Sequence, residues 1–193
     1  METAWKKYAA NDRTHARETY YETSWHPQCG NGVSIGYGLA LRTGDAVAQQ
    51  KSLKEQLVGT WKLVSSHNVR SDGSRVDNIG PSPKGILIYT NDGHFSLVNT
   101  RADLPKFASN RRDQGTPEES KAVVQGSIAY FGTYSVNEGD KVITAQIEGS
   151  TFANLIGTDQ KRLVTSLTAD ELKFINPAPS VGGTLELVWK RAK

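Results

Sequence analysis

The chain has 193 residues, of which 37% are hydrophobic and 22% are charged, and its formal net charge is +3 at pH 7. That length and composition suit one domain with an apolar core. Lys and Arg are dispersed in runs no longer than Arg111-Arg112, and no stretch approaches the ~20 consecutive apolar residues of a membrane span. We therefore expect neither nucleic acid nor a membrane as a partner.

Residues 1–50 differ from the rest of the chain because they keep neither the strand period nor the helix period. We interpret them as an N-terminal extension, disordered or not native to the domain, ahead of a domain over 51–193. Cys29 is the only cysteine, which excludes an intramolecular disulfide. Together with the lack of a secretory signal it indicates a cytoplasmic protein. His26 and Cys29 have the spacing of paired ligands, but nothing organises a site around them, so we expect no metal and no cofactor.

The domain is predicted to begin with a short helix and a strand. Ser52 followed by Glu55 is a capping-box pattern, which predicts a helical turn within 51–57. Gly59 can turn the chain out of this helix into a strand over 60–66. The prolines that follow, at 81 and 83, restrict the returning segment to an edge strand or a loop.

A hairpin and a second helix are predicted next. Strands over 85–90 and 94–99 flank Asp92-Gly93, for which we expect a type I′ turn. Further along, Thr116 and Pro117 followed by Glu119 form a well-specified helix start after a long loop. We expect this helix to be a lid or a side flap at one mouth of the β structure, where ligand access is commonly governed.

The last strands predict a definite register. With Glu138-Gly139 as the loop, Tyr134 lies opposite Ile143 and the strand period places one apolar face inward. The residues expected to point inward are Tyr130, Tyr134, Ile143, Ala145, Ile147, Leu163, Leu167, Leu172 and Phe174. By the same count Tyr130 lies opposite Ile147.

The next turn, at Ala169-Asp170, sets Thr165 opposite Phe174 and Leu167 opposite Leu172. The strand that ends the chain is expected to pair with the first, which places Trp189 near Trp61. The fold predicted is all-β: an antiparallel up-and-down closed barrel of about eight to ten strands, with a short helical insertion and an irregular N-terminal extension.

Four stretches, at residues 57–64, 84–93, 129–134 and 147–162, occur in the order found in a known family. Through them the chain resembles the small bacterial and fungal lipocalin-like domain proteins over 53–193. The resemblance implies a calycin-type barrel with a single interior cavity. Where similar sequences often have His two positions before Glu148, this chain has Gln146, which argues against an acid–base role there.

Six residues are candidates for binding a ligand. Tyr130 and Tyr134 on the inward face, and Tyr89, each combine a ring with a hydroxyl that can orient a small molecule. The remaining candidates are polar residues of two neighbouring strands: Glu148, Gln160 and Arg162.

Glu148 and Arg162 come close if their strands connect symmetrically, and an arginine held beside Gln160 suits a ligand's carboxylate or carbonyl. The alternative is an ion pair on the solvent face, which the count of faces favours. A bulge at Gly149 would reverse that facing.

These patterns favour binding of a small apolar or amphipathic molecule inside the barrel over catalysis. No nucleophile elbow, phosphate loop or paired-histidine motif occurs in the sequence. One alternative is a cavity enzyme, an isomerase or cyclase for a hydrophobic, polyketide-like substrate, with Tyr130 or Tyr134 donating a proton and Glu148 accepting one. A second alternative is a structural or interaction domain with a filled interior.

Overall fold

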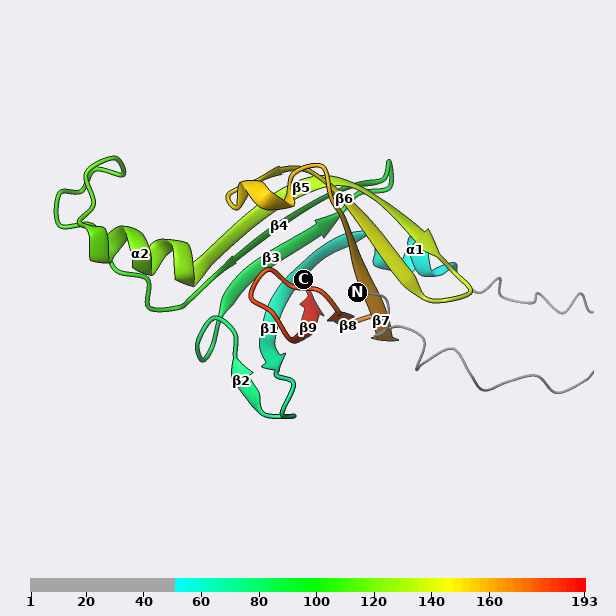
Figure 1. Cartoon of the computed structure of the whole chain (residues 1–193). Helices are drawn as coiled ribbons and strands as arrows, with labels where there is room; N and C mark the ends of the chain where they lie inside the picture. The colour runs from blue at the N-terminus through cyan, green and yellow to red at the C-terminus, as the bar shows by residue number, and fades with distance from the viewer. Residues whose placement is uncertain (1–50) are drawn as a thin grey trace, which may run out of the picture. The chain divides into compact units, whose positions relative to one another are not determined.

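The structure, a computed structural model, describes residues 51–193 (Figure 1). The helices there are α1 (Leu53–Leu57), α2 (Pro117–Gly126) and the 3-10 turn η1 (Ala153–Leu155), and none of them is long and apolar enough to cross a membrane. The extension predicted over 1–50 lies outside the described residues. The strands are β1 (Gly59–Val69), β2 (Arg75–Asp77), β3 (Lys84–Tyr89), β4 (His94–Thr100), β5 (Ser127–Asn137), β6 (Val142–Ser150), β7 (Asp159–Leu167), β8 (Glu171–Asn176) and β9 (Thr184–Arg191).

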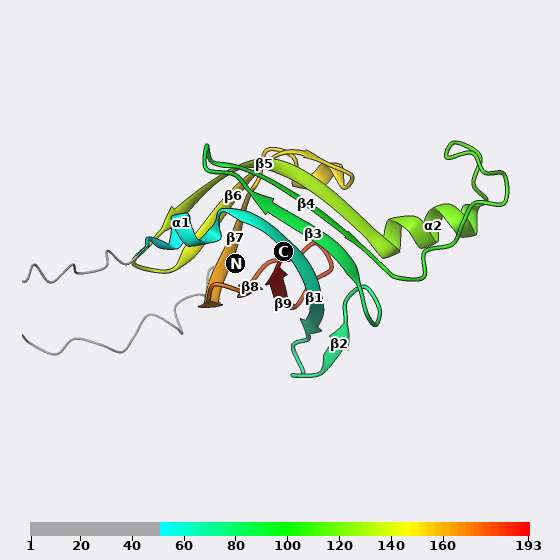
Figure 2. The ribbon, with the colours of Figure 1, turned by 180° about the vertical axis from the view of Figure 1, so that it is seen from behind.

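All strands but β2 close into one antiparallel barrel. They pair in the order β1-β3-β4-β5-β6-β7-β8-β9, and β9 pairs back with β1. The short β2 pairs with the C-terminal end of β1. Figures 1 and 2 show the curved sheet from opposite sides. The predicted closed up-and-down barrel is confirmed, as is the pairing of first and last strands.

Helix α1 lies at one end of the barrel. Ser52 Oγ accepts a hydrogen bond from Glu55 N at 3.2 Å, and the Glu55 carboxylate accepts one from Ser52 N at 2.8 Å, so the predicted capping box is confirmed. The Glu138 carboxylate, in the β5–β6 loop, accepts hydrogen bonds from Leu53 N and Lys54 N at 2.7 and 3.0 Å. These bonds satisfy N–H groups that a helix start leaves unpaired and tie α1 to the barrel.

The same end is held by Trp61 and Arg191. Trp61 is fully buried, and its Nε1 donates to the Leu57 carbonyl at 2.8 Å. The Arg191 guanidinium carbon lies 4.0 Å from the centre of the Trp61 ring, and the guanidinium donates to the carbonyls of Val58 at 2.9 Å and Gln56 at 2.6 Å. The arginine therefore links the last strand to the end of α1 across the barrel seam.

The β3–β4 turn differs from the prediction. Gly93 N donates to the Thr90 carbonyl at 3.2 Å and Thr90 N donates to the His94 carbonyl at 2.9 Å. Only Gly93, at φ 90°, lies in the left-handed region, whereas a type I′ turn requires two such residues. The loop is instead a type I turn followed by a left-handed glycine.

The β5–β6 register also differs. The loop spans residues 138–141 and ends on Lys141, whose φ is 54°, so it is longer than the predicted Glu138-Gly139 loop. Tyr134 consequently pairs with Ala145 and not with Ile143. Because a shift of two residues preserves the face, the inward side was nevertheless predicted correctly for these three buried residues.

In β7 a bulge changes the register. Leu167 pairs with Leu172 as predicted, but Phe174 pairs with Val164 rather than with Thr165. Thr165 is the extra residue of the bulge, and a bulge exchanges the faces of all residues that precede it in the strand.

As a consequence, two neighbouring side chains of β7 lie on the opposite faces of the sheet from those predicted. Leu163, which was expected inside, is 38% exposed on the outer surface. Arg162, which the face count placed outside, is only 5% exposed and points into the barrel. The bulge at Thr165 is therefore what brings a charged residue into the interior.

We expect Trp61→Ala to lower the free energy of unfolding by ~3–5 kcal/mol, because it empties a fully buried site and removes the contacts with Leu57 and Arg191. Urea denaturation measures the change. Val124→Ala is the control, since Val124 is 76% exposed and should change stability by less than ~0.5 kcal/mol. A loss below ~1 kcal/mol for Trp61→Ala would contradict this packing.

Candidate functional site

A cavity of about 470 Å³ opens at the end of the barrel away from α1. Its wall consists of inward residues from β1, β4, β5, β7, β8 and β9, together with connections at that end of the strands. Apolar side chains such as Leu97, Phe174 and Leu187 form most of the wall. The volume falls within the ~300–1,000 Å³ typical of small-molecule sites, so the barrel interior is not packed solid.

Helix α2 borders the mouth of this cavity. Its predicted start is confirmed, because Thr116 Oγ1 accepts a hydrogen bond from Glu119 N at 3.2 Å and Pro117 opens the helix. Only its last turn, with Val123 and Val124, contributes to the cavity wall. In Figure 1 the rest of α2 projects away from the barrel, so of the two predicted arrangements the helix is not a lid across the mouth but a flap at its side.

Arg162 is the buried charge of the cavity wall. Its Nη1 donates to the Lys161 carbonyl at 2.7 Å and its Nη2 donates to the Tyr130 hydroxyl at 3.1 Å. Both acceptors are neutral, and no carboxylate of the described residues forms a salt bridge with Arg162. A buried guanidinium without a counter-charge costs free energy, since its loss of hydration is not offset.

Tyr130 and Gln160 lie with Arg162 in the same wall. The Tyr130 hydroxyl accepts from Arg162, which leaves its own proton to donate to another group. The Tyr130 ring packs edge-on against Phe95 with ring centres 6.0 Å apart. Gln160 Nε2 donates to Thr158 Oγ1 at 3.1 Å. Three of the six predicted site residues are thus brought together here.

Tyr89 and Tyr134 form an aromatic layer on the α1 side of the cavity and do not line it. Their ring centres are 4.8 Å apart in an edge-to-face arrangement. Burial raises the pKa of Tyr89 far above its usual range, so this phenol stays neutral. Burial also raises the pKa of Tyr134, which is less enclosed.

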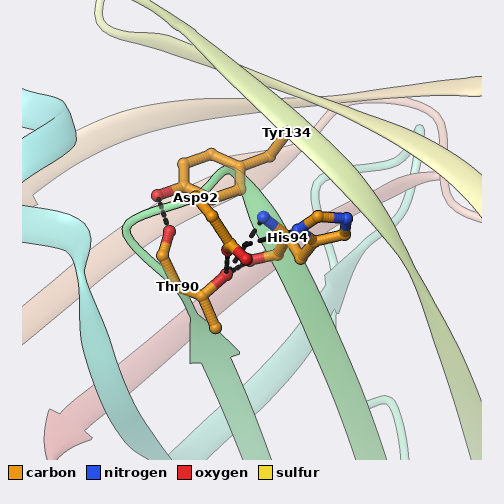
Figure 3. A network of polar contacts seen from close by, with 4 residues as sticks. All are labelled: Thr90, Asp92, His94 and Tyr134. Atoms are coloured by element: carbon orange, nitrogen blue, oxygen red, sulfur yellow. Dashed lines mark hydrogen bonds and ion pairs between the residues drawn. The ribbon is translucent and has the colours of Figure 1, made fainter.

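The Tyr134 hydroxyl is used within the fold. It donates to the Thr90 carbonyl at 2.9 Å, at the β3–β4 turn (Figure 3). In the same turn the Asp92 carboxylate accepts from Thr90 Oγ1 and lies 3.2 Å from His94 Nδ1. Hydrogen bonds from Thr90 and His94 lower the pKa of Asp92. The tyrosine therefore holds the hairpin turn against β5.

Glu148 lies apart from these residues, exposed on the outer surface. Gly132 pairs with Ile147 and Phe131 with Gly149, so Glu148 is the extra residue of a bulge in β6. This bulge and the longer β5–β6 loop together place Tyr130 opposite Ser150 rather than Ile147. The bulge considered at this glycine does not turn Glu148 inward. Glu148 and Arg162 do not pair, because Arg162 lies opposite Ile143 and faces the interior while Glu148 is exposed.

Sequence reasoning missed polar cavity residues, chiefly Ser66 and Asn99. Their exposed fractions are 3% and 5%, and neither Ser66 Oγ nor Asn99 Oδ1 has a hydrogen-bond partner in the described protein. Ser66 faces inward because Val64 is bulged out of the β1–β9 pairing, which reverses the alternation set by Trp61. Asn99 follows the regular alternation of β4 after Phe95 and Leu97, so its inward side was readable from the sequence.

The cavity wall lacks the groups that most often transfer protons or attack a substrate. Among its residues, all from 51–193, there is no Asp, Glu, His or Cys. In the same part of the chain no group of three or more potential ligands could hold a metal ion. The predicted pairing of a tyrosine donor with Glu148 as proton acceptor is not assembled, because Glu148 is on the outside.

A family model described as a lipocalin-like domain matches residues 58–192. The chain belongs to the lipocalin-like domain family. Lipocalin barrels characteristically enclose one small ligand. No curated protein matches this lipocalin-like chain.

Two solved structures are similar to this lipocalin-like chain. A redesigned beta barrel covers 74% of this chain and 100% of its own, with 15% identity and a TM-score of 0.41. Bovine odorant binding protein in complex with a selenium-containing odorant covers 75% of this chain and 76% of its own, with 14% identity and a TM-score of 0.37.

Replacing Arg162 by Met retains a long side chain and removes the buried charge. We expect the free energy of unfolding of the lipocalin-like domain, freed of small molecules by extraction, to rise by about 1 kcal/mol or more in urea denaturation. Lys161→Met, at the exposed neighbouring residue, is the control and should change it by less than ~0.5 kcal/mol. A loss of ~3 kcal/mol or more for Arg162→Met would mean that the arginine stabilises the barrel itself.

Proposed function

We propose that this lipocalin-like barrel binds a small amphipathic molecule in its interior. The apolar part of the molecule lies against Leu97, Phe174 and Leu187, and its polar part lies at Tyr130 and Arg162. The observation that carries the proposal is a buried cation in the wall of a mostly apolar cavity of about 470 Å³.

Physical cost supports this assignment. A cavity that large forfeits the packing contacts that would stabilise a filled barrel, and a buried guanidinium forfeits hydration. Both costs are offset when an apolar body with one polar group occupies the space. The retention of both features in one cavity is therefore better explained by a ligand than by stability.

The two alternatives receive less support. Catalysis by proton transfer would need a base in the cavity, and its wall contains no Asp, Glu or His among the described residues. A structural domain with a filled interior would not leave about 470 Å³ open beside aromatic side chains. Binding remains the function that the geometry favours.

The test compares two neighbouring substitutions at the cavity mouth. Leu155 lines the cavity and is half-buried, whereas Ile156 is 49% exposed and does not line it. We expect the neutral fluorescent dye Nile red to bind the wild-type chain, Leu155→Trp to weaken it by about tenfold or more through obstruction, and Ile156→Trp to leave it unchanged. Fluorescence titration measures all three affinities.

Two outcomes would contradict the proposal. The first is a failure of Nile red to bind the wild-type chain at any concentration up to its solubility limit. The second is an equal effect of both tryptophan substitutions, because binding would then take place on the outer surface rather than in the cavity. Native mass spectrometry of the purified chain provides an independent measure, since an occupied cavity adds the mass of a co-purifying molecule.

A further inference from the structure

The charge balance of the cavity bears on what kind of molecule it accepts. Arg162 is the charged member of the buried residues in 51–193, and every other polar group in the cavity wall is neutral at pH 7. The ligand-free cavity thus holds one uncompensated positive charge. A neutral ligand would displace water from the guanidinium and raise its cost further, whereas an anion would neutralise it.

The phenols beside Arg162 do not supply the missing negative charge. Burial keeps the pKa of Tyr89 far above its usual range and outweighs the opposing electrostatic effect of the Arg162 guanidinium. The Tyr130 hydroxyl accepts a hydrogen bond from Arg162 at 3.1 Å. No salt bridge within residues 51–193 involves Arg162, so a bound anion would supply the counter-charge.

The available donors suit a carboxylate. A guanidinium presents five N–H groups in a planar fork. In Arg162, Nη1 donates one hydrogen bond to the Lys161 carbonyl and Nη2 donates one to the Tyr130 hydroxyl. The remaining N–H groups and the Tyr130 O–H can donate to the two oxygens of one carboxylate, whose oxygens only accept. An amine offers no acceptor of that kind and would add a second positive charge.

The arrangement of apolar groups gives the ligand a direction. Arg162 lies toward the α1 end, because it pairs with Ile143 beside the β5–β6 loop that binds α1. It also bonds to Tyr130, whose ring packs against Phe95, and the ring centre of Phe95 is 6.3 Å from that of Tyr89. At the mouth, three apolar side chains that line the cavity are left exposed: Val124 at 76%, Phe152 at 41% and Val181 at 60%. A molecule that enters with its charged end first places its apolar end against these three side chains.

We propose that the cavity selects an amphipathic monocarboxylate, bound head-first with its carboxylate on Arg162 and Tyr130 and its apolar chain extending to Val124, Phe152 and Val181. This inference rests on the proposed function, because it specifies the polar end of the molecule bound in the same cavity. It makes Arg162 the residue that determines specificity for charge.

Matched ten-carbon ligands test the inference. Isothermal titration calorimetry of the full chain with decanoate, decanol and decylammonium varies the charge of the head at constant chain length. We expect decanoate to bind at least about tenfold more tightly than decanol, and decylammonium to bind most weakly. In Arg162→Met the preference for decanoate over decanol should disappear while decanol binding persists, which shows that the cavity is still formed.

Lys161→Met is the matched control, because it removes an exposed charge from the adjacent residue and lowers the net charge equally. It should keep the preference for decanoate. Equal binding of decanoate and decanol by the wild-type chain, or an undiminished preference in Arg162→Met, would overturn the inference and leave the proposed function intact. Absence of binding by all three ligands would overturn it together with the proposed function.

Discussion

Closure of β1 against β9 is the constraint on which the rest of the structure depends. An open sheet would leave unpaired edges, and closing it forces every inward side chain into one shared interior. At the α1 end Trp61 fills that interior, and the Arg191 guanidinium packs on the Trp61 ring and bonds to the chain just before β1. At the other end, smaller side chains such as Ser66 leave the volume of the cavity. The same closure therefore produces a packed end and an end that contains the cavity.

Bulges determine the chemistry of that interior. The bulge at Val64 turns Ser66 inward, and the bulge at Thr165 does the same for Arg162. In β6 the extra residue is Glu148 itself, which remains outside. Without the bulges at Val64 and Thr165, Ser66 and Arg162 would lie on the outer face of the barrel. The charge of the cavity wall thus depends on the bulge in β7, whereas Asn99 faces inward by the regular alternation of β4.

The bulges also limit how much of the fold and of the cavity wall could be predicted from the sequence. Helix caps at Ser52 and Thr116 depend on a few neighbouring residues, and they were predicted correctly along with the closed barrel. The bulge at Thr165 carries no glycine or proline, so nothing local marks it, and the alternation was continued through it. Leu163 and Arg162 consequently exchanged faces. Only the packing of the whole barrel decides between those two registers.

The central claim is that Arg162 holds the charged end of an amphipathic ligand inside the barrel. A crystal structure with a decanoate brominated at its terminal carbon tests this most directly, since the anomalous signal of bromine locates the apolar end. The account predicts bromine at the mouth beside Val124 and Val181, and the carboxylate within hydrogen-bond distance of Arg162. Bromine against the aromatic layer with the carboxylate in solvent, or bromine outside the barrel, would contradict it.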